Sequence, residues 1–414
     1  MAVGCTLYNP QMASEKKIAL APDQFPELNA TLYQSSPASF LTLRTQSLLL
    51  MLTQDDLIAP VYAGQAEIGS LRVGGGSLPD RDARELFVAL ESTVLFHHAA
   101  ETLWRLFLAH KGTPECPWLQ IVDLTSFKDF KDLVGKLVEN DGEKFDRKEI
   151  ARVFLGGTTP EDSAIDLNAE AFDAAIDAYV ALLVHAGLRL LNDAFIYNAA
   201  KHGLSGVPMS GMKMSVQHGE DESLPVMEGI MIASLQKTAT PTEKRKHQAE
   251  WYTAMTNVLI DQDLLLVQAF ARAIDSLWDV ARRQYLGVPG KVSVFDKFAL
   301  DAIICEPVRL SNQHVRSVTY ELATTTTYKN GSSKLNAVDV RLHPSLVPRE
   351  YFKENTSEEE RTIHATPRLI DLPLRPHDER ETIDDGQYYL PFSPRRSQAE
   401  PGSAHSSEEK TLAV

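Results

Sequence analysis

The chain has 414 residues, of which 43% are hydrophobic, and a formal net charge of −15. This length suggests two or three domains with ample apolar material for a core. The acidic balance excludes a broad nucleic-acid-binding surface and a DNA partner, because phosphate contacts need clustered Lys and Arg, but it leaves room for a small local basic site.

The cysteines and the N-terminus bear on the compartment. Cys5, Cys116 and Cys305 form no CxxC pair, which argues against a zinc site built on Cys and favours a reducing cytoplasm. The N-terminus lacks a basic-then-apolar signal pattern, and no apolar run reaches membrane-spanning length. We therefore expect a cytoplasmic protein without a membrane partner.

The first part of the chain changes from polar to helical. Residues 1–27 are polar with several prolines and are predicted to be a tail. Residues 28–76 are rich in Ser, Thr and Val, end in three glycines, and are predicted to form a small mixed α/β segment. Helical periodicity dominates residues 77–290, which we predict to be a helical bundle. Its first helix spans residues 80–110, with an Asp to cap its start and Gly112 beyond its end.

The rest of the predicted bundle holds two long helices and one hairpin. Apolar residues at helical spacing predict one helix over residues 168–202 and another over residues 248–285. Between them, two β-prone runs around an acidic loop predict a β-hairpin over about residues 212–237.

The C-terminal part has a different composition. Asn330-Gly331 between two β-prone runs predicts a second hairpin within residues 291–349. Residues 350–414 are dominated by Glu, Ser, Pro, Arg and Thr and are predicted to be a disordered acidic tail. The expected fold is therefore mainly α: a multi-helix bundle with long antiparallel helices, small β-hairpin additions and a disordered C-terminal tail.

A candidate site lies at the end of the helix predicted over residues 168–202. Phe195, Asn198 and His202 are spaced three and four apart and share a helical face that is apolar along most of its length. Asn198 and His202 are thus expected to point inward, where an unpaired polar group costs roughly 1–3 kcal/mol. Ordinary helix C-terminal chemistry is the alternative, since Lys201 suits the negative end of the helix dipole.

A second polar stripe lies on the helix predicted over residues 80–110. His98, Glu101 and Arg105 are spaced three and four apart on a face that also carries apolar residues. Glu101 and Arg105 have the favourable acid-then-base order, worth about 0.2–0.5 kcal/mol on an exposed face. On a buried face they would need partners, and a purely structural ion pair is the alternative.

The same helix carries four residues that can ligate a metal, namely His97, His98, Glu101 and His110. Helical bundles that hold two metals use Glu-x-x-His on two helices, and neither this helix nor residues 168–202 have that pattern. We therefore predict no metal and no cofactor. A serine hydrolase is not predicted either, because the nucleophile-elbow pattern G-x-S-x-G is missing around residues 206–211.

Long helices that flank a helix end with Asn, Lys and His resemble the HEPN superfamily of small helical bundles. That family's motif is an arginine, commonly followed by a polar residue such as Asn, and a histidine after four to six intervening positions. Asn198 and His202 match the polar residue and the histidine, and Tyr197 stands at the arginine position. The resemblance covers roughly residues 80–206. Arg105 begins a second match in spacing, without the polar residue after it.

The resemblance implies a prokaryotic toxin, defence or RNA-processing protein. In the family, the motif Arg and His are the catalytic pair of a metal-independent endoribonuclease, usually across a dimer interface. Because Tyr197 replaces the arginine, a non-catalytic member is equally implied. The expected partners are RNA at a local site and a second copy bound through the helical bundle.

Metal-free RNA cleavage needs a base, an acid and a cation for the phosphorane charge. His202 can serve as base or acid because the unperturbed pKa of histidine lies near neutrality, and Lys201 or Arg105 can supply the cation. The predicted substrate-binding residues are Tyr197, Asn198, His98 and Glu101.

The alternative function is a non-catalytic helical scaffold, for which Tyr197 at the arginine position is the main argument. The two hypotheses require different geometries. A ribonuclease needs the polar residues of the two helices to converge in an open cleft. In a scaffold, Glu101 and Arg105 pair with each other while His202 points to solvent.

Overall fold

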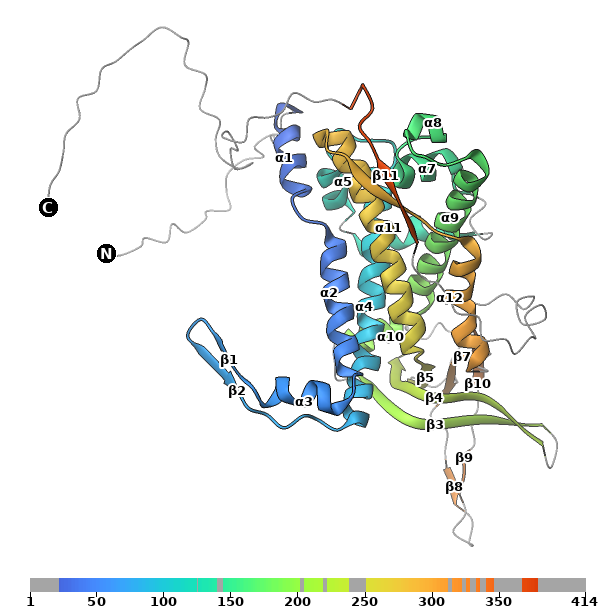
Figure 1. The fold of residues 1–414 in the computed structure, drawn as a ribbon. Coiled ribbons are helices and arrows are strands. Elements are labelled where there is room, and N and C mark those ends of the chain that lie inside the picture. The colour runs from blue at the N-terminus through green and yellow to red at the C-terminus, as the bar shows by residue number, and fades with distance from the viewer. Residues whose placement is uncertain are drawn as a thin grey trace, which may run out of the picture.

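The structure is a computed structural model that combines a layer of long helices with a five-stranded antiparallel sheet at one end of that layer (Figure 1). It describes residues 22–124, 126–139, 144–201, 205–218, 222–237, 251–311, 315–321, 325–327, 333–335, 340–345 and 367–378. The fold class is therefore mainly α, as expected from the sequence, with more sheet than two small hairpins would give.

Four long helices form the centre of the helical layer. They are α2 (Pro37–Met51), α4 (Arg81–His110), α9 (Ala169–Asn192) and α11 (Ile260–Leu286). α4 packs against the other three. The prediction for α4 is confirmed, since the Asp80 carboxylate accepts a hydrogen bond from the Ala83 amide at 2.7 Å and caps the helix.

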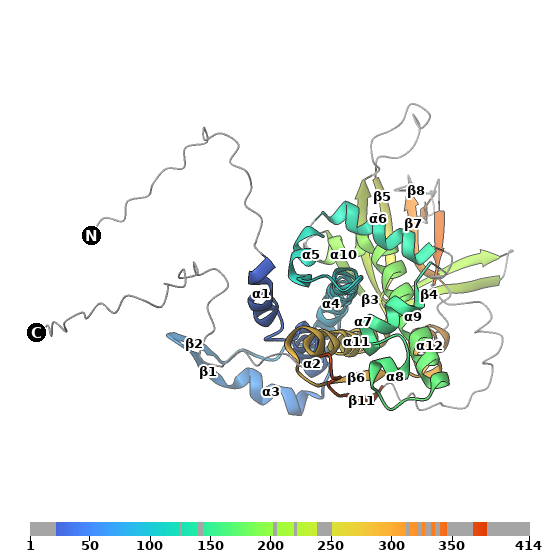
Figure 2. The ribbon, with the colours of Figure 1, turned by 90° about the horizontal axis from the view of Figure 1, so that it is seen from above.

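Shorter helices surround this layer (Figure 2). They are η1 (Pro22–Gln24), α1 (Phe25–Leu32), α3 (Asp55–Ala63), α5 (Pro117–Asp123), α6 (Phe127–Val138), α7 (Arg147–Leu155), α8 (Pro160–Ser163), α10 (Ala194–Lys201) and α12 (Lys297–Leu310).

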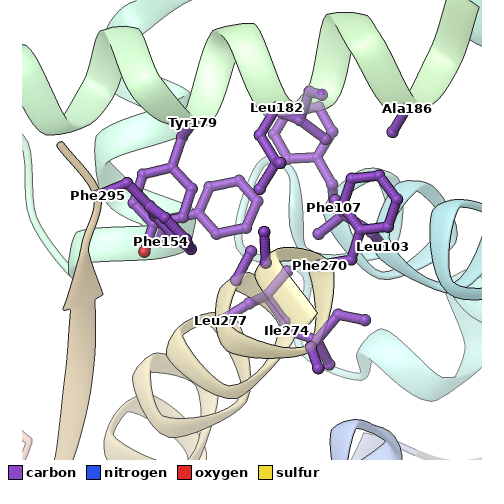
Figure 3. Packing of buried hydrophobic residues seen from close by; sticks show 14 of the residues in the cluster. Leu103, Phe107, Phe154, Tyr179, Leu182, Ala186, Phe270, Ile274, Leu277 and Phe295 are labelled. Carbon is purple, nitrogen blue, oxygen red and sulfur yellow. The ribbon is translucent and has the colours of Figure 1, made fainter. Parts of the chain in front are cut away.

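Aromatic and aliphatic side chains fill the space between α4, α9 and α11 (Figure 3). Leu103, Leu182 and Phe270, one from each helix, are completely buried. Phe154 of α7 stacks on Tyr179 of α9 with ring centroids 4.4 Å apart. This core orients α4, the helix that carries His98, Glu101 and Arg105.

The five-stranded sheet has the order β10-β7-β5-β4-β3, with every neighbouring pair antiparallel. Its strands are β3 (Gly206–His218), β4 (Glu222–Lys237), β5 (Trp251–Asn257), β7 (Val315–Glu321) and β10 (Val340–Pro344). β3 and β4 cover the predicted hairpin at residues 212–237, but they are part of this larger sheet. Three two-stranded sheets are formed by β1 (Gln65–Ile68) with β2 (Leu71–Gly74), β6 (Gly290–Val294) with β11 (Arg368–Leu372), and β8 (Thr325–Thr327) with β9 (Ser333–Leu335).

Two predicted helices differ from the structure. The helix predicted over residues 168–202 is divided at Asp193 into α9 and α10. The helix predicted over residues 248–285 begins only at Ile260, because Trp251–Asn257 is strand β5 between β4 and β7. The apolar spacing of residues 252–258 also fits a buried strand, and pairing with distant strands decides in its favour.

The C-terminal predictions hold in part. Residues 291–349 contain helix α12, which was not predicted. Asn330-Gly331 lies outside the described residues, but on its two sides β7 pairs antiparallel with β10 and β8 with β9, as a hairpin around it requires. Within the tail predicted over residues 350–414, β11 pairs with β6, so residues 367–378 are ordered. The other residues of that tail lie outside the described part of the chain.

One helix reaches the length and composition of a membrane span, contrary to the sequence-based expectation. An 18-residue window of α9 has a mean hydropathy of 1.6, and 61% of that window is buried inside the protein, as is usual for a core helix.

Candidate functional site

Tyr197 and His98 form the contact that joins α10 to α4. The Tyr197 hydroxyl lies 3.0 Å from His98 Nε2, and Arg44 of α2 lies 2.9 Å from His98 Nδ1. Because a guanidinium has only donors, Nδ1 must accept, so that Nε2 carries the hydrogen and donates it to the Tyr197 oxygen. Burial, followed by the charge of Arg44, lowers the pKa of His98. His98 is therefore neutral at neutral pH.

The Tyr197 ring is in contact on two further sides. It stacks on the buried His97 ring, with centroids 4.8 Å apart and planes 11° from parallel. The Lys201 ammonium lies 5.4 Å from the Tyr197 ring centroid, within the range of a cation–π contact. We refer to Arg44, His98, Tyr197 and Lys201 as the Tyr197 cluster.

Glu101 and Arg105 form the ion pair that their spacing predicts. Arg105 Nε lies 2.7 Å from Glu101 Oε1, and the two side chains are 19% and 24% exposed. Arg105 also donates to the carbonyl oxygen of Leu124, and its guanidinium lies 4.4 Å from the Phe130 ring centroid. These contacts tie α4 to α5 and α6 and leave Arg105 with a structural role.

Asn198 does not point inward as expected but is exposed. The buried face of α9 continues through Leu190 and Asp193 into Tyr197, whereas the sequence analysis followed the neighbouring face through Phe195, which is 37% exposed. The reason is that Asp193 is buried by ion pairs, so that hydrophobicity alone selects the wrong face. Lys201 is exposed, and His202 lies outside the described residues.

A buried network of ion pairs lies on the same face of α9. Arg189 Nε is 2.6 Å from Asp193, Arg189 Nη2 is 2.9 Å from Asp263 of α11, and Arg316 of β7 is 3.2 Å from Asp193. Burial by itself would raise the pKa of Asp193, but the charges of Arg316 and Arg189 outweigh it and hold that pKa well below its usual range. Asp193 therefore stays ionised, and the network joins the helices to the sheet.

Two buried histidines, His97 and His185, lie within electrostatic range of this network. Burial lowers the pKa of His97 to about 4 and that of His185 to about 3, so both are neutral. The Nε2 atoms of both have no hydrogen-bond partner among the described residues. This network was not predicted from the sequence. Its only local signal is the i, i+4 spacing of Arg189 and Asp193, since the other charges come from distant elements.

The four residues weighed as metal ligands on α4 do not converge. The His110 ring nitrogens lie 2.7 Å from the Tyr33 hydroxyl and 2.7 Å from the Leu106 carbonyl oxygen, inside the core. His97 and His98 contact Tyr197 from different sides. No group of three His, Cys, Asp or Glu in the described part of the chain is arranged to hold a metal ion.

The structure therefore brings His98, Tyr197 and Lys201 together, pairs Glu101 with Arg105 beside them, and turns Asn198 outward. Arg44, which the sequence analysis did not consider, completes the cluster from α2. This arrangement places the half-buried His98 and the buried Tyr197 beside the exposed ammonium of Lys201. In comparisons with known proteins, no family model, no curated protein and no solved structure matches the chain.

Proposed function

We propose that the protein binds RNA at the Tyr197 cluster and needs no metal to do so. The observation that carries this proposal is a local excess of positive charge in an acidic protein. His98 lies within electrostatic range of two cations, Arg44 and Lys201, and of one carboxylate, Glu101, which is itself paired with Arg105. We also propose that the long helices form a HEPN-like bundle with antiparallel neighbours, which places this cluster at the end of one helix.

The cluster has the donors that a phosphodiester needs. Lys201 is exposed and free of any ion pair among the described residues, so it can approach a phosphate directly. The Tyr197 oxygen accepts its hydrogen bond from His98, so its own hydrogen remains to be donated. An exposed Asn198 one residue further adds an amide for contacts to bases or sugars.

Cleavage is a second candidate activity, favoured by the lowered pKa of His98. A histidine that is neutral at pH 7 can accept a proton from a ribose hydroxyl, and His98 would do so at Nδ1 after Arg44 releases that nitrogen. Arg105 is a poor choice for the cation, because Glu101, Leu124 and Phe130 already hold it. Lys201 takes that role in this candidate, and the pairing of Arg105 is what favours a non-catalytic protein instead.

RNA binding is tested by fluorescence anisotropy with labelled single-stranded RNA and tRNA in EDTA. Lys201→Glu should weaken binding at least about tenfold. It should also reduce the slope of log affinity against log salt concentration by roughly the contribution of one phosphate contact or more. Lys148→Glu makes the same change of charge on α7, at an exposed position away from α10, and should change affinity less than about twofold.

The same mixtures, run on a denaturing gel, test cleavage. Products formed by the wild type and lost in both His98→Gln and His202→Ala would establish a metal-independent endoribonuclease. If the wild type binds neither RNA, the proposal is wrong and the scaffold hypothesis replaces it.

A further inference from the structure

Helix α2 has an exposed apolar face that nothing in the described chain covers. Phe40, Leu43 and Leu50 recur at helical spacing and are 66%, 61% and 56% exposed. The opposite face, with Leu41 and Leu48, is buried against α4 and α11. α2 is therefore apolar on both sides, a pattern that in a water-exposed helix indicates a contact surface.

The face also lacks charge. Arg44 is the one charged residue in α2, and it is engaged with His98 at 2.9 Å and with Glu91 at 3.8 Å. No charged side chain of α2 is thus left to keep the row of Phe40, Leu43 and Leu50 in water.

An arm formed by α3, β1 and β2 projects from the end of α2, away from the rest of the molecule (Figures 1 and 2). β1 and β2 pair only with each other, and an isolated two-stranded hairpin is marginally stable in water at best. Leu57, Val61 and Leu71 of the arm are 65%, 76% and 65% exposed. Of the described arm side chains, only Ile58 is buried.

The base of the arm is held firmly. The guanidinium of Arg84, which is 2% exposed, donates to the Asp55 carboxylate and to the carbonyl oxygens of Met51 (2.9 Å) and Thr53 (3.3 Å). The arm is therefore fixed in direction where it leaves α2, while the described side chains of its outer part are exposed or half-buried. Such an arm is suited to packing on a second surface.

We propose that the chain forms a twofold dimer in which the arm of each copy lies along the exposed face of α2 of the other copy. This proposal does not depend on the RNA proposal, although Arg44 of the Tyr197 cluster also lies on α2. A twofold contact requires that the two surfaces that meet are both present on each copy, and the α2 face and the arm satisfy this. Both surfaces expose large apolar side chains that can pack on each other, and the exposed Glu67–Arg72 ion pair of the hairpin can stay in water at the edge of the contact.

The available area suits a dimer. Six large apolar side chains of the α2 face and the arm are partly exposed, and their exposed fractions together equal about four fully exposed side chains. This corresponds to roughly 700 Å² of apolar surface per copy. A standard interface takes about 800 Å² from each partner. A membrane surface fits less well, because helices that lie on membranes carry Lys and Arg on their polar side and this chain has a net charge of −15.

Sedimentation velocity of the full-length chain over a range of concentrations tests the proposal. The wild type should sediment as a dimer, and Leu43→Glu and Val61→Glu should each raise the dimer dissociation constant by about 30-fold or more, as loss of a central contact does. Leu310→Glu places the same charge on an exposed leucine of α12, 73% exposed, and should leave the dimer intact. Circular dichroism and thermal unfolding would verify that each variant remains folded.

A cross-linking experiment tests the arrangement itself. In a Cys5→Ser background, where Cys116 and Cys305 are buried, a mixture of Leu43→Cys and Val61→Cys chains should form intermolecular disulfides faster than either variant alone. A monomeric wild type, a dimer that survives both glutamate substitutions, or vesicle binding by a monomer would each overturn the proposal.

Discussion

Replacing Asp378 with Asn tests what holds residues 367–378 against the helices. Asp378 is 3% exposed, and its carboxylate forms ion pairs with two arginines. Arg375 bonds both carboxylate oxygens, at 2.7 and 2.8 Å, and Arg283 Nε lies 3.5 Å from Oδ2. Arg283 is itself completely buried, and burial, followed by the charge of Arg375, lowers its pKa to about 10. Without the carboxylate, two guanidinium groups would face each other in a buried setting.

The expected effect follows from the loss of one partner of a buried ion pair, which typically costs 3–5 kcal/mol. The lower end applies, because asparagine still accepts a hydrogen bond. Arg283 also keeps its bonds to the carbonyl oxygens of Gly156 (2.6 Å) and Ser163 (2.7 Å). We therefore expect Asp378→Asn to lower the free energy of unfolding by about 3 kcal/mol at neutral pH.

Urea unfolding monitored by circular dichroism measures this change. The control is Asp371→Asn in the same segment, where an 87% exposed carboxylate lies 3.6 Å from Lys291, and its effect should stay below about 0.5 kcal/mol. Hydrogen exchange supplies a local readout, because the amides of β6 should lose protection in Asp378→Asn if β11 detaches. Equal, small effects of the two substitutions would show that the buried ion pairs do not hold the segment.

Two further predictions concern the helical core. Folded His97, His110 and His185 have pKa values lowered to about 4, 4 and 3, whereas an unfolded histidine titrates near 6.5. The unfolded chain therefore binds more protons than the folded chain as the pH falls below about 6.5. Urea unfolding should show that the free energy of unfolding decreases by roughly 2 kcal/mol per histidine between about pH 7 and pH 5. His185→Gln should remove about a third of this total decrease. In the second prediction, Gly187→Ala places a methyl group within 2.6 Å of a valine side chain on α6 and should lower the free energy of unfolding by about 1–3 kcal/mol. Gly135→Ala meets no atom closer than 3.9 Å and should raise the free energy of unfolding by about 0.5–1 kcal/mol. Thermal unfolding of the two variants measures the difference.

Features encoded by neighbouring residues were predictable from the sequence. α4 combines a capping Asp80 with apolar residues over 30 positions, and its existence and bounds follow from these local signals. The Glu101–Arg105 pair is also local and forms as its spacing predicts. α6 likewise begins at a local signal, Ser126, whose hydroxyl accepts a hydrogen bond from the amide of residue 129.

Features decided by distant residues were not predictable. Trp251–Asn257 becomes a strand because β4 and β7 lie on either side of it, although its apolar spacing is compatible with a helix. β11 lies in a polar, proline-containing stretch, and its partner β6 is more than 70 residues earlier in the chain. Its five-residue length gives no periodic signal strong enough to distinguish it from a disordered tail.

The candidate site also combines features decided by neighbouring residues with features decided by distant ones. Hydrophobicity placed Asn198 on the inner face of the helix, whereas the structure places Tyr197 there, because Asp193 is drawn into the core by Arg189 and Arg316. The amide of Tyr197 in turn donates to the Asp193 carbonyl oxygen at 3.1 Å, so the buried carboxylate and the first turn of α10 are one unit. The position of the Tyr197 hydroxyl beside His98 is thus a consequence of buried electrostatics rather than of apolar patterning, and the ion pairs beneath the cluster act as its positioning device.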